Sequence, residues 1–236
     1  MLSLFRKVLV VATHPDDESF GMGGTLLYLK KLGLEIGWVV VTTISTFYET
    51  RIRNTEKITR LRQNREEQIA KAGLKMGIRK IWDLGFPTLS LDIVPKGEII
   101  GKFIEIINEF RPELVFTNGN FDVNYEHEIV FDCLQNSTKM FYNPELKGLL
   151  AYETPSSTEA RFSDNSPLFA PNFYVDISEY LDNKIDLCRI YENEFKNDTI
   201  HPRSEWGITN YAGFRGLQIA VKYAEAFKSY RMIEKG

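Results

Sequence analysis

One short stretch near the start of the chain is dense in side chains that can do chemistry. It reads Thr13-His14-Pro15-Asp16-Asp17-Glu18 and follows an apolar run. Burying several charges together is costly unless a counter-ion compensates them. His14 and Asp17 are three residues apart, so a turn can bring an imidazole nitrogen and a carboxylate oxygen to one point, and this pair suits zinc or another divalent ion such as Fe²⁺. Asp16 could then reach a water molecule at the metal without being a ligand.

Two other interpretations of this region need to be weighed. Asp16 or Asp17 could cap a following helix, with His14 on the surface, but capping needs one carboxylate rather than a cluster. Alternatively, Gly21-Met22-Gly23-Gly24 could be the phosphate loop of a nucleotide-binding α/β protein. Against this, Leu26 stands where G-x-G-x-x-G requires its third glycine, and the glycines come late after the strand. We therefore expect these glycines to let the backbone turn tightly into a helix.

The same stretch carries a family resemblance. Residues 12–18, Ala-Thr-His-Pro-Asp-Asp-Glu, resemble the A-H-P-D-D-E signature of the PIG-L/LmbE-like N-acetylglucosaminyl deacetylases, with Thr13 where the signature usually has Ala. The resemblance extends over most of the chain. It implies a zinc-dependent hydrolase that removes the acetyl group from an N-acetylated amino sugar. In that enzyme His14 and Asp17 would bind the metal and Asp16 would be the general base. A non-catalytic sugar-binding member of the family is the alternative.

A second polar group follows the apolar run at residues 114–117. It places His127 at the start of an expected helix, after another strand of the sheet, so that it can face the first cluster. Residues 122–127, Asp-Val-Asn-Tyr-Glu-His, resemble the D-x-N-x-D-H variant of the family motif, which implies that His127 is the third metal ligand. Asn124 stands where other members carry a histidine, and we expect it to contact the substrate. Glu126 replaces the usual Asp and would orient a metal ligand or the general base from behind.

The third and last histidine, His201, lies in His201-Pro202-Arg203-Ser204. Together with Arg215-Gly216 and the segment 223–227, this motif resembles the C-terminal signature of an LmbE-like subgroup. His201 is either the acid that protonates the leaving amine or part of a turn that leaves Arg203 to bind the substrate. Both alternatives stay open.

Arginines near the second crossover helix are candidates for substrate binding. Arg65 resembles a family arginine near the substrate, and Glu67 or Gln68 could match a family glutamate shortly after it. An arginine at the rim of a crevice can hold a phosphate or carboxylate with two hydrogen bonds. The alternative is a solvated helix face. The Arg-rich stretch 51–65 hints at a phosphate- or nucleotide-linked sugar, and a lipid-linked sugar is also open.

The hydrophobic pattern predicts the scaffold that positions these residues. Continuous apolar, β-branched runs at residues 8–13 and 35–43 are typical of buried strands, and a helix near 24–33 between them completes a βαβ unit. The other expected elements are a helix near 58–76 closed by Gly77, a strand at 80–84, a helix at 98–110, a strand at 114–117, and helices near 126–137, 177–195 and 216–231. This alternation predicts a mainly parallel sheet with right-handed crossovers.

The predicted architecture is one Rossmann-like, doubly wound α/β domain over residues 1–236, with helices on both faces of the sheet. In such sheets ligands bind outside the carboxyl ends of the strands. Residues just after Thr13, Thr43, Leu84 and Thr117 should therefore share one crevice. We expect the C-terminal part, from about residue 150 to 236, to complete the substrate pocket.

Composition narrows the remaining possibilities. With 236 residues, 43% of them hydrophobic and 26% charged, the chain can build a core. A net charge of −3 offers no basic excess for nucleic acid. The two cysteines, expected to be buried and inert, exclude a disulfide framework. The apolar run at the N-terminus is too short for a membrane span or a signal peptide, which predicts a cytoplasmic protein. The oligomeric state stays open, with a homo-oligomer as one alternative.

Overall fold

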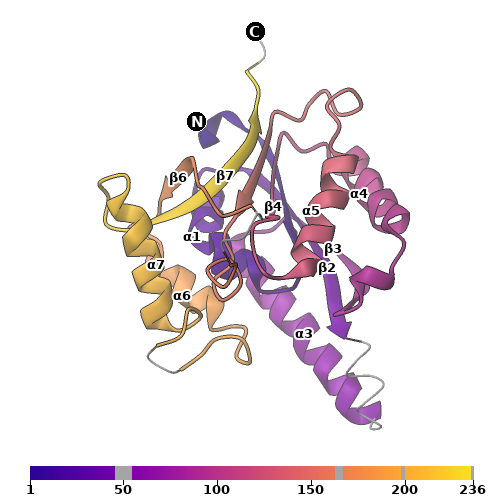
Figure 1. Ribbon diagram of the computed structural model, residues 1–236, viewed down its shortest axis with the longest axis horizontal. Coiled ribbons are helices and arrows are strands. Elements are labelled where there is room, and N and C mark those ends of the chain that lie inside the picture. The colour runs from indigo at the N-terminus through magenta and orange to yellow at the C-terminus, as the bar shows by residue number, and fades with distance from the viewer. Residues whose placement is uncertain (46–54, 163–166, 198–199, 235–236) are drawn as a thin grey trace.

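The computed structural model describes residues 1–45, 55–162, 167–197 and 200–234 (Figure 1). Its sheet contains β1 (Lys7–Ala12), β2 (Glu35–Ser45), β3 (Lys80–Thr88), β4 (Leu114–Asn118), β5 (Gly148–Tyr152), β6 (Phe173–Asp176) and β7 (Ala224–Met232). The helices are α1 (Asp17–Lys31), α3 (Thr55–Met76), α4 (Lys96–Phe110), α5 (Tyr125–Ser137), α6 (Leu181–Cys188) and α7 (Glu205–Leu217). Two 3-10 turns, η1 (Leu2–Leu4) and η2 (Leu91–Ile93), complete the described elements.

The strands lie in the order β3-β2-β1-β4-β5-β7-β6. Strands β1 to β5 pair in parallel, whereas β7 runs antiparallel to both of its neighbours, β5 and β6. Helices α4 and α5 cover one face, and α1, α3, α6 and α7 pack on the other (Figure 1). The predicted doubly wound α/β domain with a mainly parallel sheet is therefore confirmed.

Strand β1 lies at the centre and is buried on both faces. Val8, Val10 and Ala12 belong to the core on the α1 side, and Leu9 and Val11 belong to the core on the α4–α5 side. This explains why the sequence shows a continuous apolar run rather than an alternation. The strand order reverses between β1 and β4, and a ligand site is expected at that point.

Helix α1 begins directly at the polar cluster, seven residues earlier than expected. Its backbone is kinked at Met22 (φ −143°, ψ 23°), which frees two amides of the following turn. The carboxylate of Glu225 on β7 accepts hydrogen bonds from the N–H groups of Gly24 and Thr25, at 2.9 and 2.6 Å. Lys184 on α6 pairs with Glu225 at 2.6 Å inside the protein. The C-terminal half thus caps the second part of the helix that starts at the site.

Two glycines of α1 allow close packing of the helix. A Cβ on Gly21 would lie 2.4 Å from the Tyr152 ring, and a Cβ on Gly24 would lie 2.8 Å from Ile177. Both positions are buried within the helix. The backbone does turn at Met22, but it turns inside α1 and not ahead of the helix as expected. The phosphate-loop alternative fails, because residues 21–24 lie within the helix.

The C-terminal third departs most from the predicted elements. The expected helix near 216–231 is wrong, because α7 ends at Leu217 and the second half of the segment is β7. The expected helix near 177–195 is shorter, with α6 ending at Cys188 and turns following it. Helix α7 and strands β5 and β6 were not predicted. By contrast, Gly33 and Gly77, at φ +76° and +73°, end α1 and α3 where expected.

Two smaller expectations concern cysteines and membranes. Cys133 and Cys188 are buried, and burial raises the pKa of the two thiols to about 11 and about 12, as expected for inert side chains. Within the described parts of the chain, no helix combines the length and the apolar character that a bilayer crossing requires.

Candidate metal centre and active-site pocket

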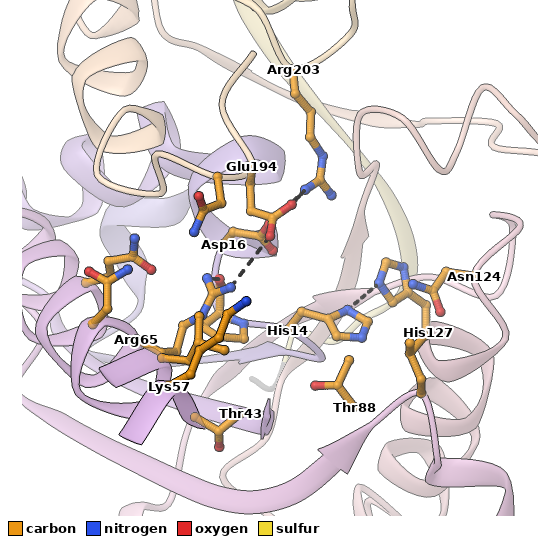
Figure 2. Close-up of a pocket in the computed structure, with 16 residues that line it drawn as sticks. His14, Asp16, Thr43, Lys57, Arg65, Thr88, Asn124, His127, Glu194 and Arg203 are labelled. Atoms are coloured by element: carbon orange, nitrogen blue, oxygen red, sulfur yellow. Dashed lines mark hydrogen bonds and ion pairs between the residues drawn. The ribbon is translucent and has the colours of Figure 1, made fainter. Parts of the chain in front are cut away.

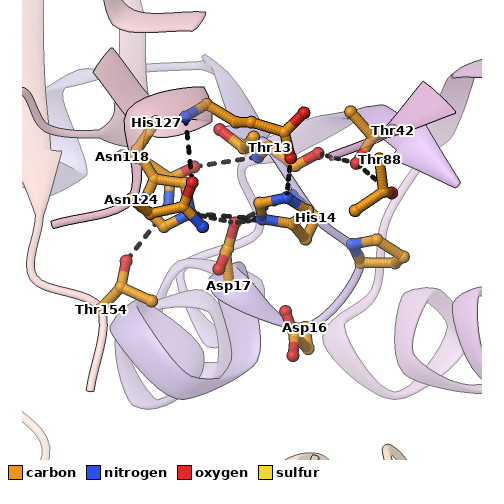
Figure 3. A network of polar contacts seen from close by, with 12 residues as sticks. Thr13, His14, Asp16, Asp17, Thr42, Thr88, Asn118, Asn124, His127 and Thr154 are labelled. Carbon is orange, nitrogen blue, oxygen red and sulfur yellow. Dashed lines mark hydrogen bonds and ion pairs between the residues drawn. The ribbon is translucent and has the colours of Figure 1, made fainter. Parts of the chain in front are cut away.

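The loop after β1 is tied to both neighbouring strands. The N–H of Thr13 donates to Oδ1 of Asn118 at the end of β4, at 2.9 Å, and the carbonyl of Thr13 accepts from the N–H of Thr42 on β2, at 2.9 Å. The amide group of Asn118 in turn donates to Oγ1 of Thr154 at 3.1 Å (Figure 3). These buried bonds fix the backbone immediately before His14.

Three side chains of the predicted metal set meet at one point. His14 Nδ1 lies 3.4 Å from Asp17 Oδ2, His127 Nε2 lies 3.4 Å from the same oxygen, and the two nitrogens are 3.2 Å apart. His14 and Asp17 come from the loop after β1 and the start of α1, and His127 comes from the first turn of α5. Two nitrogens and one oxygen in a compact triangle form a group that could hold a divalent metal ion.

Each histidine contacts a carboxylate through the ring nitrogen that faces away from the triangle. His14 Nε2 lies 2.8 Å from Glu126 Oε2, and His127 Nδ1 lies 2.6 Å from Asp122 Oδ2. Glu126 and Asp122 are fully buried. Such partners fix the tautomer of a ligating histidine, so that the nitrogen facing the triangle carries the lone pair. Glu126 therefore orients His14, and it does not contact Asp16 in the bonds that the structure records.

The charges around the triangle favour a positive charge at its centre. Burial lowers the pKa of His127, but the charges of Asp17 and Asp122 outweigh it and raise that pKa to about 10. Burial likewise lowers the pKa of His14, and hydrogen bonds with Asp17 and Glu126 raise it to about 9. Burial raises the pKa of Asp17, yet the neighbouring imidazoles bring it well below its usual value. The surrounding carboxylates thus favour positive charge here, whether as protons or as a metal ion.

Asp16 sits beside the triangle with its two oxygens in different environments. Oδ2 accepts from Nη1 of Arg203 at 2.8 Å, whereas Oδ1 is buried without a hydrogen-bond partner among the described residues. Burial raises the pKa of Asp16 and Arg203 lowers it, with a net value of about 6. The backbone of Asp16 has φ +153° and ψ −27°, a region that costs about 1–3 kcal/mol and occurs mainly at functional sites.

A cavity of about 550 Å³ opens in front of these residues (Figure 2). The ends of β2 and β3, the loop after β1, the start of α5, helix α3 and two C-terminal loops line it. The lining side chains are His14, Pro15, Asp16, Thr43, Lys57, Leu61, Asn64, Arg65, Gln68, Thr88, Leu89, Asn124, His127, Asn193, Glu194 and Arg203. Residues that end or follow these four strands therefore share one crevice, although β3 reaches it at Thr88 rather than at Leu84 and β4 contributes through Asn124 and His127.

The comparisons with known proteins agree with this arrangement. The family model PIG-L, described as GlcNAc-PI de-N-acetylase, matches residues 9–136, which include the whole triangle. The chain belongs to the PIG-L family. A diacetylchitobiose deacetylase of Thermococcus kodakarensis is 24% identical over 94% of this chain and 82% of its own length.

Two solved structures share the fold. The conserved protein TT1542 of Thermus thermophilus is 28% identical, with a TM-score of 0.72 over 97% of this chain and 96% of that one. GalB, a 4-carboxy-2-hydroxymuconate hydratase of Pseudomonas putida, is 19% identical, with a TM-score of 0.73 over 98% and 99% of the two chains. Because a hydratase has this fold, the fold alone does not decide the reaction of a PIG-L chain.

The side chains expected to bind substrate lie in the pocket of this PIG-L domain. Arg65 donates to the carbonyl of Pro15 at 3.1 Å and lies 3.5 Å from Glu194. Gln68 rather than Glu67 lines the cavity after Arg65. Asn124 caps α5, because its Oδ1 accepts from the N–H of Glu126 at 3.0 Å, which leaves the amide nitrogen for a ligand. Residues 46–54, which include the first part of the Arg-rich stretch, lie outside the described residues.

His201 is not brought to this pocket. It lines a separate, largely apolar cavity beside Trp206 and Phe214. Its Nδ1 accepts from the N–H of Arg203 at 3.0 Å, and its carbonyl accepts from Ser204, which caps α7. The placement agrees with the turn-shaping alternative and not with a proton donor at the metal, since the ring is engaged by its own loop.

Sequence reasoning gave no role to several residues of the site, among them Asp122 and Glu194. Asp122 stood in the quoted motif without a role, although its position five residues before His127 in one loop was a signal. Glu194 lies within 3.5 Å of both Arg65 and Arg203 at the pocket. A glutamate in turns after a short helix gives no local signal, so only the tertiary structure reveals it.

Proposed function

We propose that this chain is a metal-dependent hydrolase that removes the N-acetyl group from an N-acetylated amino sugar. The observation that carries the proposal is the triangle of His14, Asp17 and His127 at the wall of an open pocket, with the Asp16 carboxylate beside it. Three protein ligands with room for a further one are typical of a catalytic rather than a structural metal site.

We propose zinc as the metal. Ligand bonds of about 2.0–2.1 Å in tetrahedral geometry separate the ligand atoms by about 3.3–3.4 Å, and the three atoms here are 3.2–3.4 Å apart. Fe²⁺ is the alternative, because two histidines and one carboxylate also suit it. When bound, such a metal polarises an amide carbonyl and lowers the pKa of water.

The chain's own residues supply the remaining steps. Asp16 has a buried oxygen, Oδ1, without a partner, and we assign to it the acceptance of a proton from the attacking water. The same carboxyl then returns the proton to the departing amine, because His201 lies at another cavity. Asp122 and Glu126 keep the two imidazoles oriented during both steps.

Support for an amino-sugar substrate comes from PIG-L membership and from the Thermococcus relative that is named as a diacetylchitobiose deacetylase. A volume of about 550 Å³ suits a small molecule. The amides of Asn64, Gln68 and Asn193 line it and can bind sugar hydroxyls. Of the possible phosphate, nucleotide and lipid linkages, Lys57 and Arg65 favour a phosphate-bearing one. A cytoplasmic location and a homo-oligomer stay predictions.

The test is acetate release by the metal-loaded protein from N-acetylglucosamine, its 1-phosphate and diacetylchitobiose. Asp16→Asn should keep the metal and lower kcat by about 10²–10⁴-fold. Asp182→Asn, on the exposed face of α6, serves as the matched control with unchanged kcat. Full activity in Asp16→Asn would overturn the assignment of the base. Unchanged metal content in His14→Ala and His127→Ala would overturn the metal centre.

A further inference from the structure

The side chain of Arg203 lines the pocket and is bound there to the proposed base. Its Nη1 donates to Asp16 Oδ2 at 2.8 Å (Figure 2). An arginine that binds substrate would be expected to offer its guanidinium to the cavity, as the sequence suggested for this residue. The observed contact joins Arg203 to a carboxylate that is 4% exposed.

Arg203 is itself held by contacts from several elements. Its Nε donates to the carbonyl of Pro155 at 3.1 Å, and its guanidinium lies 4.9 Å from the centre of the Phe20 ring. Glu194 Oε2 lies 3.5 Å from Nη1 on the pocket side. These contacts fix the orientation of the guanidinium plane. A guanidinium held in this way also fixes the position of the carboxylate oxygen that it binds.

The loop that delivers Arg203 is also rigid. The N–H of Arg203 donates to Nδ1 of His201, and Ser204 caps α7 through the N–H of Gly207 at 3.0 Å. A Cβ on Gly207 would lie 2.2 Å from the carbonyl oxygen of His201, so the turn is closely packed. The motif 201–204 thus acts as one unit whose effect on the site passes through the side chain of Arg203.

Asp16 requires such support. Its backbone is in a strained conformation, and its N–H reaches the buried Glu18 at 3.2 Å. Of its two carboxylate oxygens, Arg203 occupies Oδ2 and leaves Oδ1 without a partner. A buried carboxylate oxygen without a partner calls for an explanation, and a hydrogen bond from a water at the metal would supply one.

We infer that Arg203 is a positioning residue: it holds Asp16 by Oδ2, so that Oδ1 is the oxygen that takes the proton. The inference rests on the proposed hydrolase function, and it gives Arg203 a role besides the substrate binding expected from the sequence. Glu194 stabilises the arrangement by contacting both Arg203 and Arg65.

The test compares Arg203→Gln and Arg203→Lys with Arg215→Gln. Arg215 lies on α7 in an equally buried pair with Glu153, at 2.6 Å, but does not line the pocket. Arg203→Gln should lower kcat by about 10²-fold, with KM changed less than about threefold and metal content unchanged. Arg203→Lys should recover part of kcat, and Arg215→Gln should keep kcat within about twofold.

Crystal structures of the three variants without metal give a readout that does not depend on activity. In Arg203→Gln the Asp16 side chain should adopt a new or a mixed rotamer, whereas Arg215→Gln should leave it in place. An unchanged Asp16 rotamer in Arg203→Gln, or a rise in KM at constant kcat, overturns the inference. If the wild-type protein releases no acetate from any N-acetyl sugar, the proposed function fails, and the rotamer comparison still decides whether Arg203 positions Asp16.

Discussion

Next to the metal triangle, the two oxygens of the Glu126 carboxylate bind different groups. Its Oε2 faces His14 Nε2 at 2.8 Å, while its Oε1 accepts from the N–H groups of Ser90 and Leu91, both at 3.1 Å. The side chain therefore ties a metal ligand to the loop after β3, where Leu89 lines the pocket with a positive φ of 62°. Only a carboxylate offers acceptors on both sides.

The variant Glu126→Gln tests this dual role. A glutamine has nearly the same shape but one NH₂ group, so either His14 or the two backbone amides would face a donor. We expect metal affinity to fall by about 10–100-fold, measured by competition with a chelator of known strength. Glu128→Gln, at a half-buried position of α5 that pairs with Arg161, should change it less than about twofold. Equal affinities in the two variants would show that Glu126 does not orient His14.

Helix α1 is the element that joins the site to the C-terminal half. Its first residue is Asp17, its kink at Met22 exposes amides to Glu225 on β7, and its glycines allow Tyr152 and Ile177 to approach. Close packing at a glycine leaves no space for a methyl group, and overpacking a core typically costs about 1–3 kcal/mol.

Gly24→Ala and Gly101→Ala form a matched pair for this element. The new methyl group at Gly24 would lie 2.8–2.9 Å from three atoms of Ile177, so we expect the free energy of unfolding to fall by about 1–3 kcal/mol. At Gly101, inside α4, nothing lies within 4 Å, and alanine should raise stability by about 0.5–1 kcal/mol. Urea denaturation measures both, and a stable Gly24→Ala protein would contradict the packing argument.

The N-terminal half of the fold could be predicted because its elements carry local signals. Strands buried on both faces show as apolar runs, and Gly33 and Gly77 mark helix ends. The segment 224–232 carries no such signal: its first four residues are all buried, two of them alanines and one a glutamate, and its remaining charges are typical of a helix. Pairing with β5 and β6 decides its conformation, and tertiary context of this kind overrides propensity.

The candidate site divides in the same way. The dense cluster at residues 13–18 predicted the region of the metal and the base, because several charges after a buried strand are costly to bury without a counter-ion. The contact of Arg203 with Asp16 and the position of Glu194 could not be predicted, since they depend on how loops near α6 and α7 fold over the end of β1.

In the whole molecule, the site lies at the carboxyl ends of the central strands. A second polar cluster lies at their amino ends. Glu113 precedes β4 and accepts from the N–H of Arg6 at 2.5 Å and from Lys147 Nζ at 2.8 Å. It thus joins the amino ends of β1, β4 and β5. Burial raises the pKa of Glu113, but the hydrogen bonds and the charge of Lys147 outweigh it and lower that pKa below its ordinary value.

Glu113→Gln should therefore change stability and not catalysis. A carboxyl whose pKa is lower in the folded state contributes stability above its unfolded pKa of about 4.3, and that contribution is lost as the pH falls through the folded value. At pH 7 we expect the variant to lose about 1–3 kcal/mol of unfolding free energy. The loss should shrink as the pH falls below about 4, because the wild-type carboxyl then also becomes neutral. Urea titrations of both proteins at pH 7 and pH 3 measure the difference, and acetate release at pH 7 should stay within about twofold of the wild type. A loss of stability that is the same at both pH values would mean that the charge of Glu113 does not stabilise the amino ends of these strands.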